Sequence, residues 1–235
     1  MALWEEQGYP NDVDSSGAAY FNAVWANLVS LTFDDELPDG TTSRDDSRWI
    51  RVVSVLMEDP RNPWWDDVST VSITETRDEI LLRALQYARN QLTNSLGKDA
   101  DRWQWGDLHK AHFTHPVLPP ETTPGVLAWL VNPTPVAVPG GSSSVNATGW
   151  DASPDAQGAF SYAMTTAPSM RMVVDLEDPD ASTWVMTSGA SGHPTSRHYA
   201  NQLGAWVRGE TFSWPFTREA VEERAGATLT LTPGE

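Results

Sequence analysis

The 235-residue sequence contains no cysteine. A chain without cysteine cannot form disulfides, cannot bind zinc or iron–sulfur clusters through thiolates, and cannot use a cysteine nucleophile. A chain of this length can still bury a core large enough for stability without such cross-links. The hydrophobic content of 40% and the charged content of 20% are typical of a globular protein.

Basic residues are also few. The chain has 15 Lys and Arg residues against 32 Asp and Glu residues, which gives a formal net charge of −17. A surface with this charge repels the phosphates of nucleic acids and of anionic lipids. We therefore expect no nucleic-acid partner and no membrane partner.

Long apolar runs are missing as well. Nowhere do about 18 apolar residues follow one another, so no membrane-spanning helix is predicted. Residues 1–14 are polar and lack the basic and apolar regions of a signal peptide. Taken alone, these features predict a cytoplasmic protein, a prediction that fails if the true N-terminus lies upstream of Met1.

Tryptophan, in contrast, is abundant, with twelve residues. Large aromatic side chains fill cores and interfaces, and they also stack on carbohydrates and other flat ligands. The cluster of Trp64, Trp65, Trp103 and Trp105 is either core or a stacking surface, and the core interpretation is favoured.

The first half of the chain has helical periodicity. Apolar residues recur at spacings of three and four after the capping side chains of residues 14–16, which predicts a helix to about Leu31. A second helix is expected over Asp46–Met57. The capping-box pattern of Thr76 and Glu79, with Gly97 as C-cap, predicts the longest helix over Thr76–Ser95.

The second half is rich in strand patterns. Seven prolines mark Pro116–Gly141 as a long irregular connection. Strands are predicted at Ser144–Thr148, Met170–Leu176, Thr183–Thr187 and Ala227–Thr232, and helices at His198–Arg208 and Thr217–Ala225. The fold class is therefore α+β, with a helical part at about 14–115 and a strand-rich part at about 116–235, in one segment 1–235.

Three histidines, His109, His112 and His115, are spaced i, i+3 and i+6. On a helix the third lies about 240° round from the first, so the three cannot converge on one metal ion. A helical metal site would normally use i and i+4. We interpret these histidines as packed, hydrogen-bonding side chains at a helix end or turn.

A second histidine pair, His193 and His198, lies beside Ser191 and Ser196. A serine nucleophile needs a base within hydrogen-bonding distance and an acid that orients the base. The Gly189-Ala-Ser-Gly192 string lacks the G-x-S-x-G spacing of a nucleophile elbow. A glycine turn with serine and threonine caps is the favoured interpretation.

Two further patterns have structural interpretations. Pro139–Ser144 lacks the lysine and the spacing of a phosphate-binding loop, so we predict a turn. The acidic runs at 34–36, 45–46 and 66–67 lack calcium-loop spacing and are interpreted as solvated faces and helix-start charges.

Five strings together resemble the penicillin acylase (penicillin amidase) family. They are Asp35–Pro38, Pro63–Asp67 with Glu75–Ile80, Trp103–His109 with Phe113–Pro116, Ser169–Leu176, and Ser191–Pro194 with Ser196–Tyr199, Asn201, Gln202, Trp206 and Gly209. Each string is weak by itself, but their order makes a specific match. His112 falls outside the pattern.

The resemblance implies an N-terminal nucleophile hydrolase with a four-layer αββα sandwich. In this family a precursor is cleaved into two subunits, and the new N-terminal serine of the larger (beta) subunit attacks an amide, with its own α-amine as base. Substrates include penicillins and N-acyl homoserine lactones. A structural calcium and the oxyanion asparagine are expected upstream of the matched region.

On this basis the chain is expected to be the C-terminal part of the larger subunit, inactive alone, with the remaining acylase chain or subunits as partner. No residue here is assigned a catalytic, substrate-binding or metal-binding role, and no cofactor is expected in this segment. By family analogy the location is periplasmic or secreted. The alternative is a freestanding acidic, Trp-rich module that binds carbohydrate or a protein partner.

Overall fold

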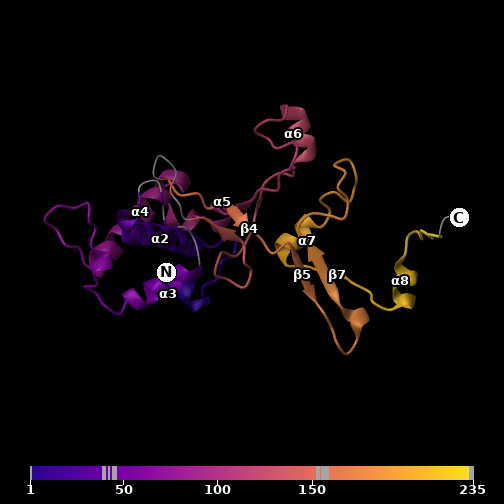
Figure 1. The fold of residues 1–235 in the computed structure, drawn as a ribbon, viewed down its shortest axis with the longest axis horizontal. Helices are drawn as coiled ribbons and strands as arrows, with labels where there is room; N and C mark the ends of the chain where they lie inside the picture. Colours follow the sequence, from indigo (N-terminus) through magenta and orange to yellow (C-terminus); the bar gives the residue numbers. More distant parts are fainter. Residues whose placement is uncertain are drawn as a thin grey trace. The chain divides into compact units, whose positions relative to one another are not determined.

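The structure, a computed structural model, describes residues 2–38, 41, 43, 47–151, 154 and 159–232. The chain divides into two compact units, Met1–Ala167 and Pro168–Glu235. Figure 1 shows that helices dominate the first unit and that a small sheet forms the centre of the second. The mixture of helices and small antiparallel sheets is α+β, as the sequence predicts.

Two long helices, α2 (Ser16–Phe33) and α4 (Arg77–Leu96), pack together in the first unit. The hydroxyl of Ser15 accepts a hydrogen bond from the amide of Ala18 and so caps α2. Thr76 and Glu79 form the predicted capping box of α4, and Gly97 follows the helix with a φ of 96°. Local caps therefore confirm both predicted helices.

Alanine side chains line the buried faces of these two helices. They are Ala18, Ala19, Ala23 and Ala26 on α2, and Ala84 and Ala88 on α4. Methyl side chains allow two helix backbones to approach closely. Helix α3 (Ser47–Leu56) confirms the second predicted helix, and its Val53 and Leu56 pack in a core cluster with Phe33, Trp65 and Ile80. The predicted start at Asp46, and the acidic pair Asp45–Asp46, lie outside the described residues.

Shorter elements complete the first unit. They are α1 (Ala2–Glu6), η1 (Asp34–Glu36), η2 (Pro63–Trp65), η3 (Ala100–Arg102), α5 (Trp105–Leu108) and α6 (Gly125–Val131), with β1 (Lys110–Ala111) antiparallel to β2 (Val136–Ala137) and β3 (Gly149–Trp150) antiparallel to β4 (Met164–Thr166). A second core cluster lies here, around the aromatic rings of Trp103, Trp105, Trp150 and Tyr162.

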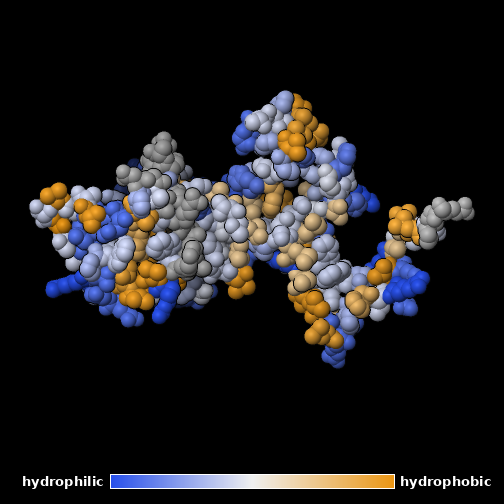
Figure 2. Space-filling model, in the orientation of Figure 1, coloured by the Kyte–Doolittle hydropathy of each residue, from blue (hydrophilic) through white to orange (hydrophobic). Residues whose placement is uncertain are grey.

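Two predictions for this unit need correction. Ser144–Thr148 was predicted as a strand but forms turns, because the Ser144 hydroxyl and the Asn146 carbonyl bond locally and β3 begins only at Gly149. The Pro116–Gly141 connection is not irregular throughout, since it contains α6 and β2. Val126, Trp129 and Leu130 of α6 are exposed, and Figure 2 shows apolar surface on this helix.

The second unit is built on an antiparallel sheet in the order β5 (Met170–Val173), β6 (Thr183–Met186) and β7 (Phe212–Ser213). The remaining elements are η4 (Pro179–Ala181), α7 (Leu203–Arg208) and α8 (Arg218–Arg224). Strands β5 and β6 confirm two predicted strands, and Thr217 caps α8 as predicted. Trp206 is buried, and its indole lies 4.5 Å from the Arg171 guanidinium.

Two further predictions fail in this unit. The helix predicted from His198 begins only at Leu203, because turns closed by Ser196 and Ala200 carbonyls occupy the preceding residues. Ala227–Thr232 is not a strand: Leu229 and Leu231 are exposed, and this segment pairs with no strand of the described sheet. An alternating pattern makes a strand only where a neighbour supplies the hydrogen bonds. Among the helices that the structure describes, none combines the length and hydropathy needed to cross a bilayer.

Candidate functional site

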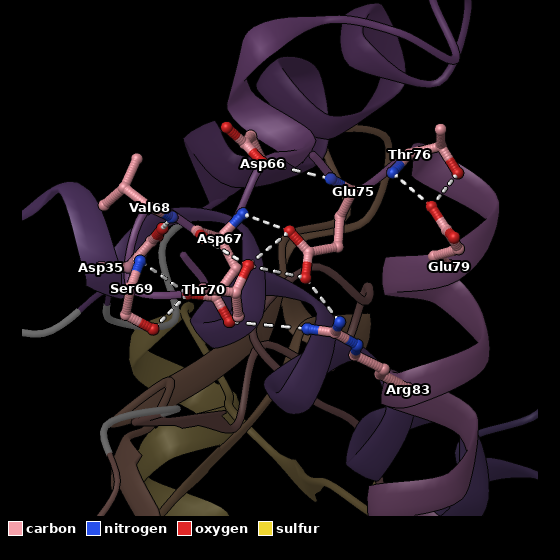
Figure 3. A network of polar contacts seen from close by, with 10 residues as sticks. All are labelled: Asp35, Asp66, Asp67, Val68, Ser69, Thr70, Glu75, Thr76, Glu79 and Arg83. Atoms are coloured by element: carbon pink, nitrogen blue, oxygen red, sulfur yellow. Dashed lines mark hydrogen bonds and ion pairs between the residues drawn. The ribbon is translucent and has the colours of Figure 1, made fainter. Parts of the chain in front are cut away.

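A polar network of the first unit surrounds Glu75, just before the start of α4 (Figure 3). The Glu75 side chain is 1% exposed and lies 2.5 Å from the Nη2 atom of Arg83. Its oxygens also accept hydrogen bonds from the Thr70 hydroxyl (3.0 and 3.1 Å) and from the Asp67 amide (3.2 Å). The backbone amide of Glu75 donates to Asp66 and closes the 66–75 loop on itself, while the Arg83 contact fastens this loop to α4.

Burial and hydrogen bonding have opposite effects on the pKa of Glu75. Burial alone would raise the pKa of this carboxyl, but hydrogen bonds from Arg83, Asp67 and Thr70 outweigh burial and lower it. The same contact raises the pKa of Arg83, whose side chain is also 3.5 Å from Asp67. Glu75 therefore stays ionised and shielded from solvent, which suits a structural ion pair and not a general acid.

The neighbouring acidic residues bond to the backbone in the same way. Asp35 accepts a hydrogen bond from the Val68 amide, while burial raises its pKa. Asp34 accepts hydrogen bonds from Ser30 and from the Ser43 amide, both 2.5 Å long. The other oxygen of Asp35, Oδ1, is buried and has no hydrogen-bond partner among the described residues. In the parts of the chain that the structure describes, no three acidic or histidine side chains gather as a calcium site requires, and the family resemblance places its calcium upstream of this segment.

His109 is a buried core histidine directly after α5. Its ring stacks on Trp105 with centroids 4.7 Å apart, and its Nδ1 lies 2.7 Å from the Tyr162 carbonyl oxygen. A carbonyl only accepts, so Nδ1 carries a proton. The Nε2 atom lies 3.1 Å from the Thr148 hydroxyl. Burial lowers the pKa of His109 against the opposing effect of these hydrogen bonds.

The other two histidines of this row have environments that differ from that of His109. His115 accepts hydrogen bonds from the amides of Val117 and Leu118 through Nδ1, and His112 is exposed. The row is not helical, because α5 ends at Leu108. Within the described ranges, no three His, Asp or Glu side chains are placed to hold a metal ion. The interpretation of His109 and His115 as hydrogen-bonding residues is confirmed.

The Ser191–His198 segment is a chain of capped turns. The hydroxyls of Ser191 and Ser196 accept hydrogen bonds from the backbone amides two residues ahead, those of His193 and His198. The His198 ring accepts from Arg197, and the His193 ring lies 2.9 Å from the Thr195 hydroxyl. Each serine thus caps its own turn, and the predicted glycine turn is confirmed.

The Pro139–Ser144 turn is also confirmed. Gly140 has a φ of 102°, donates its amide to Asn11, and accepts a hydrogen bond from the Trp105 indole. Of the four clustered tryptophans, Trp65, Trp103 and Trp105 are core residues as favoured, while Trp64 is 45% exposed.

Sequence reasoning missed the Glu75–Arg83 pair. Opposite charges eight residues apart are common, so their spacing alone carries no signal. The available signal was the loop before α4, where several acidic and hydroxyl side chains lie next to one glutamate. The burial of Glu75 becomes visible only when this loop folds back onto the helix.

A family model described as penicillin amidase matches residues 1–223. The chain is similar to acyl-homoserine lactone acylase QuiP of Pseudomonas syringae pv. tomato, at 34% identity over 94% of this chain and 27% of that protein. The corresponding QuiP of Pseudomonas aeruginosa is 31% identical, over 93% of this chain and 27% of its own length. Penicillin acylase 2 proenzyme of Pseudomonas sp. is 37% identical over 55% of this chain and 14% of that protein.

The chain thus spans about a quarter of the length of the two QuiP relatives.

Proposed function

The chain belongs to the penicillin amidase family, and from this premise we propose that it is the C-terminal segment of an amidohydrolase. The complete enzyme would hydrolyse the amide of a penicillin-like or N-acyl homoserine lactone-like substrate. The names of the relatives support these two substrate classes. The observation that carries the proposal is the match of nearly the whole chain to about a quarter of a named acylase.

The nucleophilic serine and its base lie, in this proposal, in the upstream part of the larger subunit. The site geometry supports this assignment. The hydroxyls of Ser191 and Ser196 each cap a turn, and the ionised Glu75 is neutralised by Arg83. These groups stabilise the segment, and the chain alone has no amidase activity.

The sheet of the second unit supports a role as part of a larger αββα sandwich. Strand β5 lies at an edge of the three-stranded sheet, and its Met172 and Val173 are half or more exposed. Figure 2 shows apolar surface over this region. An open edge with apolar side chains is unfavourable in water and pairs readily with another strand. The rest of the acylase would supply that strand.

Location and the alternative function follow from the same proposal. We infer a periplasmic or secreted enzyme by family analogy. A freestanding carbohydrate-binding module would need a continuous stacking surface. The exposed tryptophans of the described chain lie in η2 (Trp64), in α6 (Trp129) and just after β7 (Trp214), so the acylase proposal is preferred.

The decisive experiment compares two proteins. One is the purified 235-residue chain, and the other is the product of the complete open reading frame around it. Both are assayed for hydrolysis of a phenylacetyl amide and of an N-acyl homoserine lactone. We expect turnover from the longer product alone. Robust turnover by the 235-residue chain would show that catalysis does not lie upstream, and inactivity of both proteins would contradict the amidohydrolase proposal.

A further inference from the structure

Helix α6 is apolar on every side. Its sequence, Gly-Val-Leu-Ala-Trp-Leu-Val, contains no charged, hydroxyl or amide side chain. A helix that is apolar all round is normally buried on all sides. In α6 only Ala128 and Val131 are buried, whereas Val126 and Trp129 are 85% and 77% exposed, and Figure 2 shows apolar surface here. The chain by itself therefore leaves an apolar face of this helix in contact with water.

The exposed residues of α6 form one continuous face. Val126, Trp129 and Leu130 are spaced i, i+3 and i+4, so their side chains are neighbours on the helix surface. A hollow of about 460 Å³ lies beside Trp129 and is also lined by Phe113 and Pro133. The face thus combines a projecting indole with a recess that an apolar side chain of a partner can fill.

The segment around α6 is also poor in charge. Residues 111–150 contain a single Asp, Glu, Lys or Arg residue, Glu121, although these four types make up 20% of the whole chain. The cores of protein–protein interfaces are depleted of charged residues and enriched in aromatic residues relative to the remaining surface. The composition of this segment is therefore that of an interface and not of a solvated loop.

Hydrogen bonds within the first unit hold this segment in place. Strand pairing of Lys110 with Ala137 joins its two ends. Between them, the Asn132 side chain accepts a hydrogen bond from the His115 amide at 2.6 Å and donates to the Leu118 carbonyl at 3.0 Å. A surface that is already ordered loses little conformational entropy when a partner binds. The α6 face is therefore prepared for docking.

Charge argues against two of the occupants that could cover this face. Helices that lie on a membrane surface carry Lys or Arg on their polar side, and residues 111–150 contain neither. A second copy would bring together two chains that each have a net charge of −17, and like charges oppose association. The rest of an acylase is the third candidate, since this chain spans only 27% of QuiP from Pseudomonas syringae pv. tomato.

We propose that the face formed by Val126, Trp129 and Leu130 docks on an apolar surface of the remaining acylase polypeptide. Trp129 is the anchor at the centre of this contact, because large aromatic side chains contribute most to the binding energy of interfaces. This inference rests on the proposed function, from which it takes the identity of the partner. It adds a docking surface in the first unit to the open strand edge of the second unit.

The lack of cysteine makes this face directly measurable, because one introduced cysteine is the only thiol of the chain. Val126→Cys places a thiol on the exposed face. Ala128→Cys is the matched control, since Ala128 is buried on the same helix. Both variants are made in the 235-residue chain and in the product of the complete open reading frame. Reaction with a maleimide is followed over time by mass spectrometry of the peptide that contains the new thiol.

In the 235-residue chain, the thiol of Val126→Cys should react at least about tenfold faster than that of Ala128→Cys. In the longer product it should slow by at least about tenfold, at every protein concentration and without lipid. The proposal is overturned if the rate is unchanged in the longer product, or if the two thiols react equally in the 235-residue chain. Protection that grows with protein concentration would instead assign the face to a second copy, and protection that needs added phosphatidylcholine vesicles would assign it to a membrane; either result also overturns the proposal.

Leu130→Cys decides on the same face if the longer product with Val126→Cys lacks a cooperative thermal transition. Amide hydrolysis is measured separately, on the longer product without substitutions. Turnover combined with an unprotected thiol overturns the docking surface and leaves the proposed function intact. A protected thiol without turnover supports the docking surface and overturns the proposed function.

Discussion

The guanidinium of Arg83 lies 2.5 Å from the carboxylate of Glu75, and the two side chains differ sharply in exposure, at 32% and 1%. Arg83 therefore reaches from the surface of α4 to neutralise a charge that the preceding loop has buried. The pair connects local helix structure to the packing of the 66–75 loop.

Removal of the Arg83 side chain should lower the free energy of unfolding. Arg83→Met leaves Glu75 buried without its counter-charge, and we expect a loss of about 2 to 3 kcal/mol in urea unfolding, reduced by the partial exposure of Arg83. The double variant Glu75→Gln/Arg83→Met should recover part of this loss. Arg218→Met breaks the exposed pair with Glu222 and serves as control, with no measurable change expected. Equal effects of the two single variants would show that the pair has no special role.

Acid should destabilise the first unit through His109. Burial lowers its pKa in the folded state, so the unfolded chain takes up a proton at a higher pH than the folded chain does. Stability is therefore retained at and above about pH 7 and falls as the pH drops below the unfolded value of about 6.5, by at most about 1.4 kcal/mol per pH unit. Urea midpoints measured between pH 7.5 and 5.5 test this dependence. His109→Gln should be less stable at pH 7.5 but nearly flat over this range; a slope equal to that of the unsubstituted chain would assign the effect to other groups.

Trp105 and Trp150 should respond differently to the same substitution. Trp105→Phe removes a hydrogen bond to the Gly140 carbonyl, whereas Trp150→Phe removes none within the described residues. Both variants lose the same volume, so Trp105→Phe should cost about 1 to 3 kcal/mol more, the penalty of an unsatisfied buried carbonyl. Thermal and urea unfolding of the two variants measure the difference. Equal losses would show that the lost indole hydrogen bond adds no destabilisation beyond that of the lost side-chain volume.

Gly140 and Gly97 offer a second matched pair. Both have positive φ values, 102° and 96°, so alanine strains the backbone at either position. A Cβ on Gly140 would also lie 2.1 Å from the Asn146 carbonyl oxygen, while nothing lies within 4 Å at Gly97. We expect a loss of about 1 to 2 kcal/mol for Gly97→Ala and a clearly larger loss for Gly140→Ala. Similar losses for the two variants in urea titrations would show that the turn at Gly140 adjusts to the added methyl group without a further loss of stability.

The sequence predicts those elements whose ends are decided locally. Helices α2, α4 and α8 have Ser15, Thr76 and Thr217 as their N-cap residues, and each of these caps bonds within three residues. The two-residue strands of the first unit are set by distant contacts, such as the pairing of Lys110 with Ala137, and no local pattern specifies them. Ala227–Thr232 shows the opposite error, because its alternation exists without a partner strand.

The candidate site also combines features that are decided locally with features that depend on distant contacts. The capping role of Glu79 is visible in the pattern that begins at Thr76, whereas the burial of Glu75 depends on how the loop folds.

Trp105 is one of five buried tryptophans whose indole N–H donates to a backbone carbonyl; the others are Trp4, Trp65, Trp103 and Trp206. These five bonds have a consequence for the environments in which the chain can stay folded. Each joins a side chain to a backbone carbonyl 6 to 38 residues away, so each holds together the two ends of a loop, which is the position that a disulfide occupies in other proteins. Thiol reductants and oxidants that open or scramble disulfides leave an N–H to carbonyl bond unchanged. The loops of this cysteine-free chain are therefore closed in the same way whatever the redox potential of the compartment.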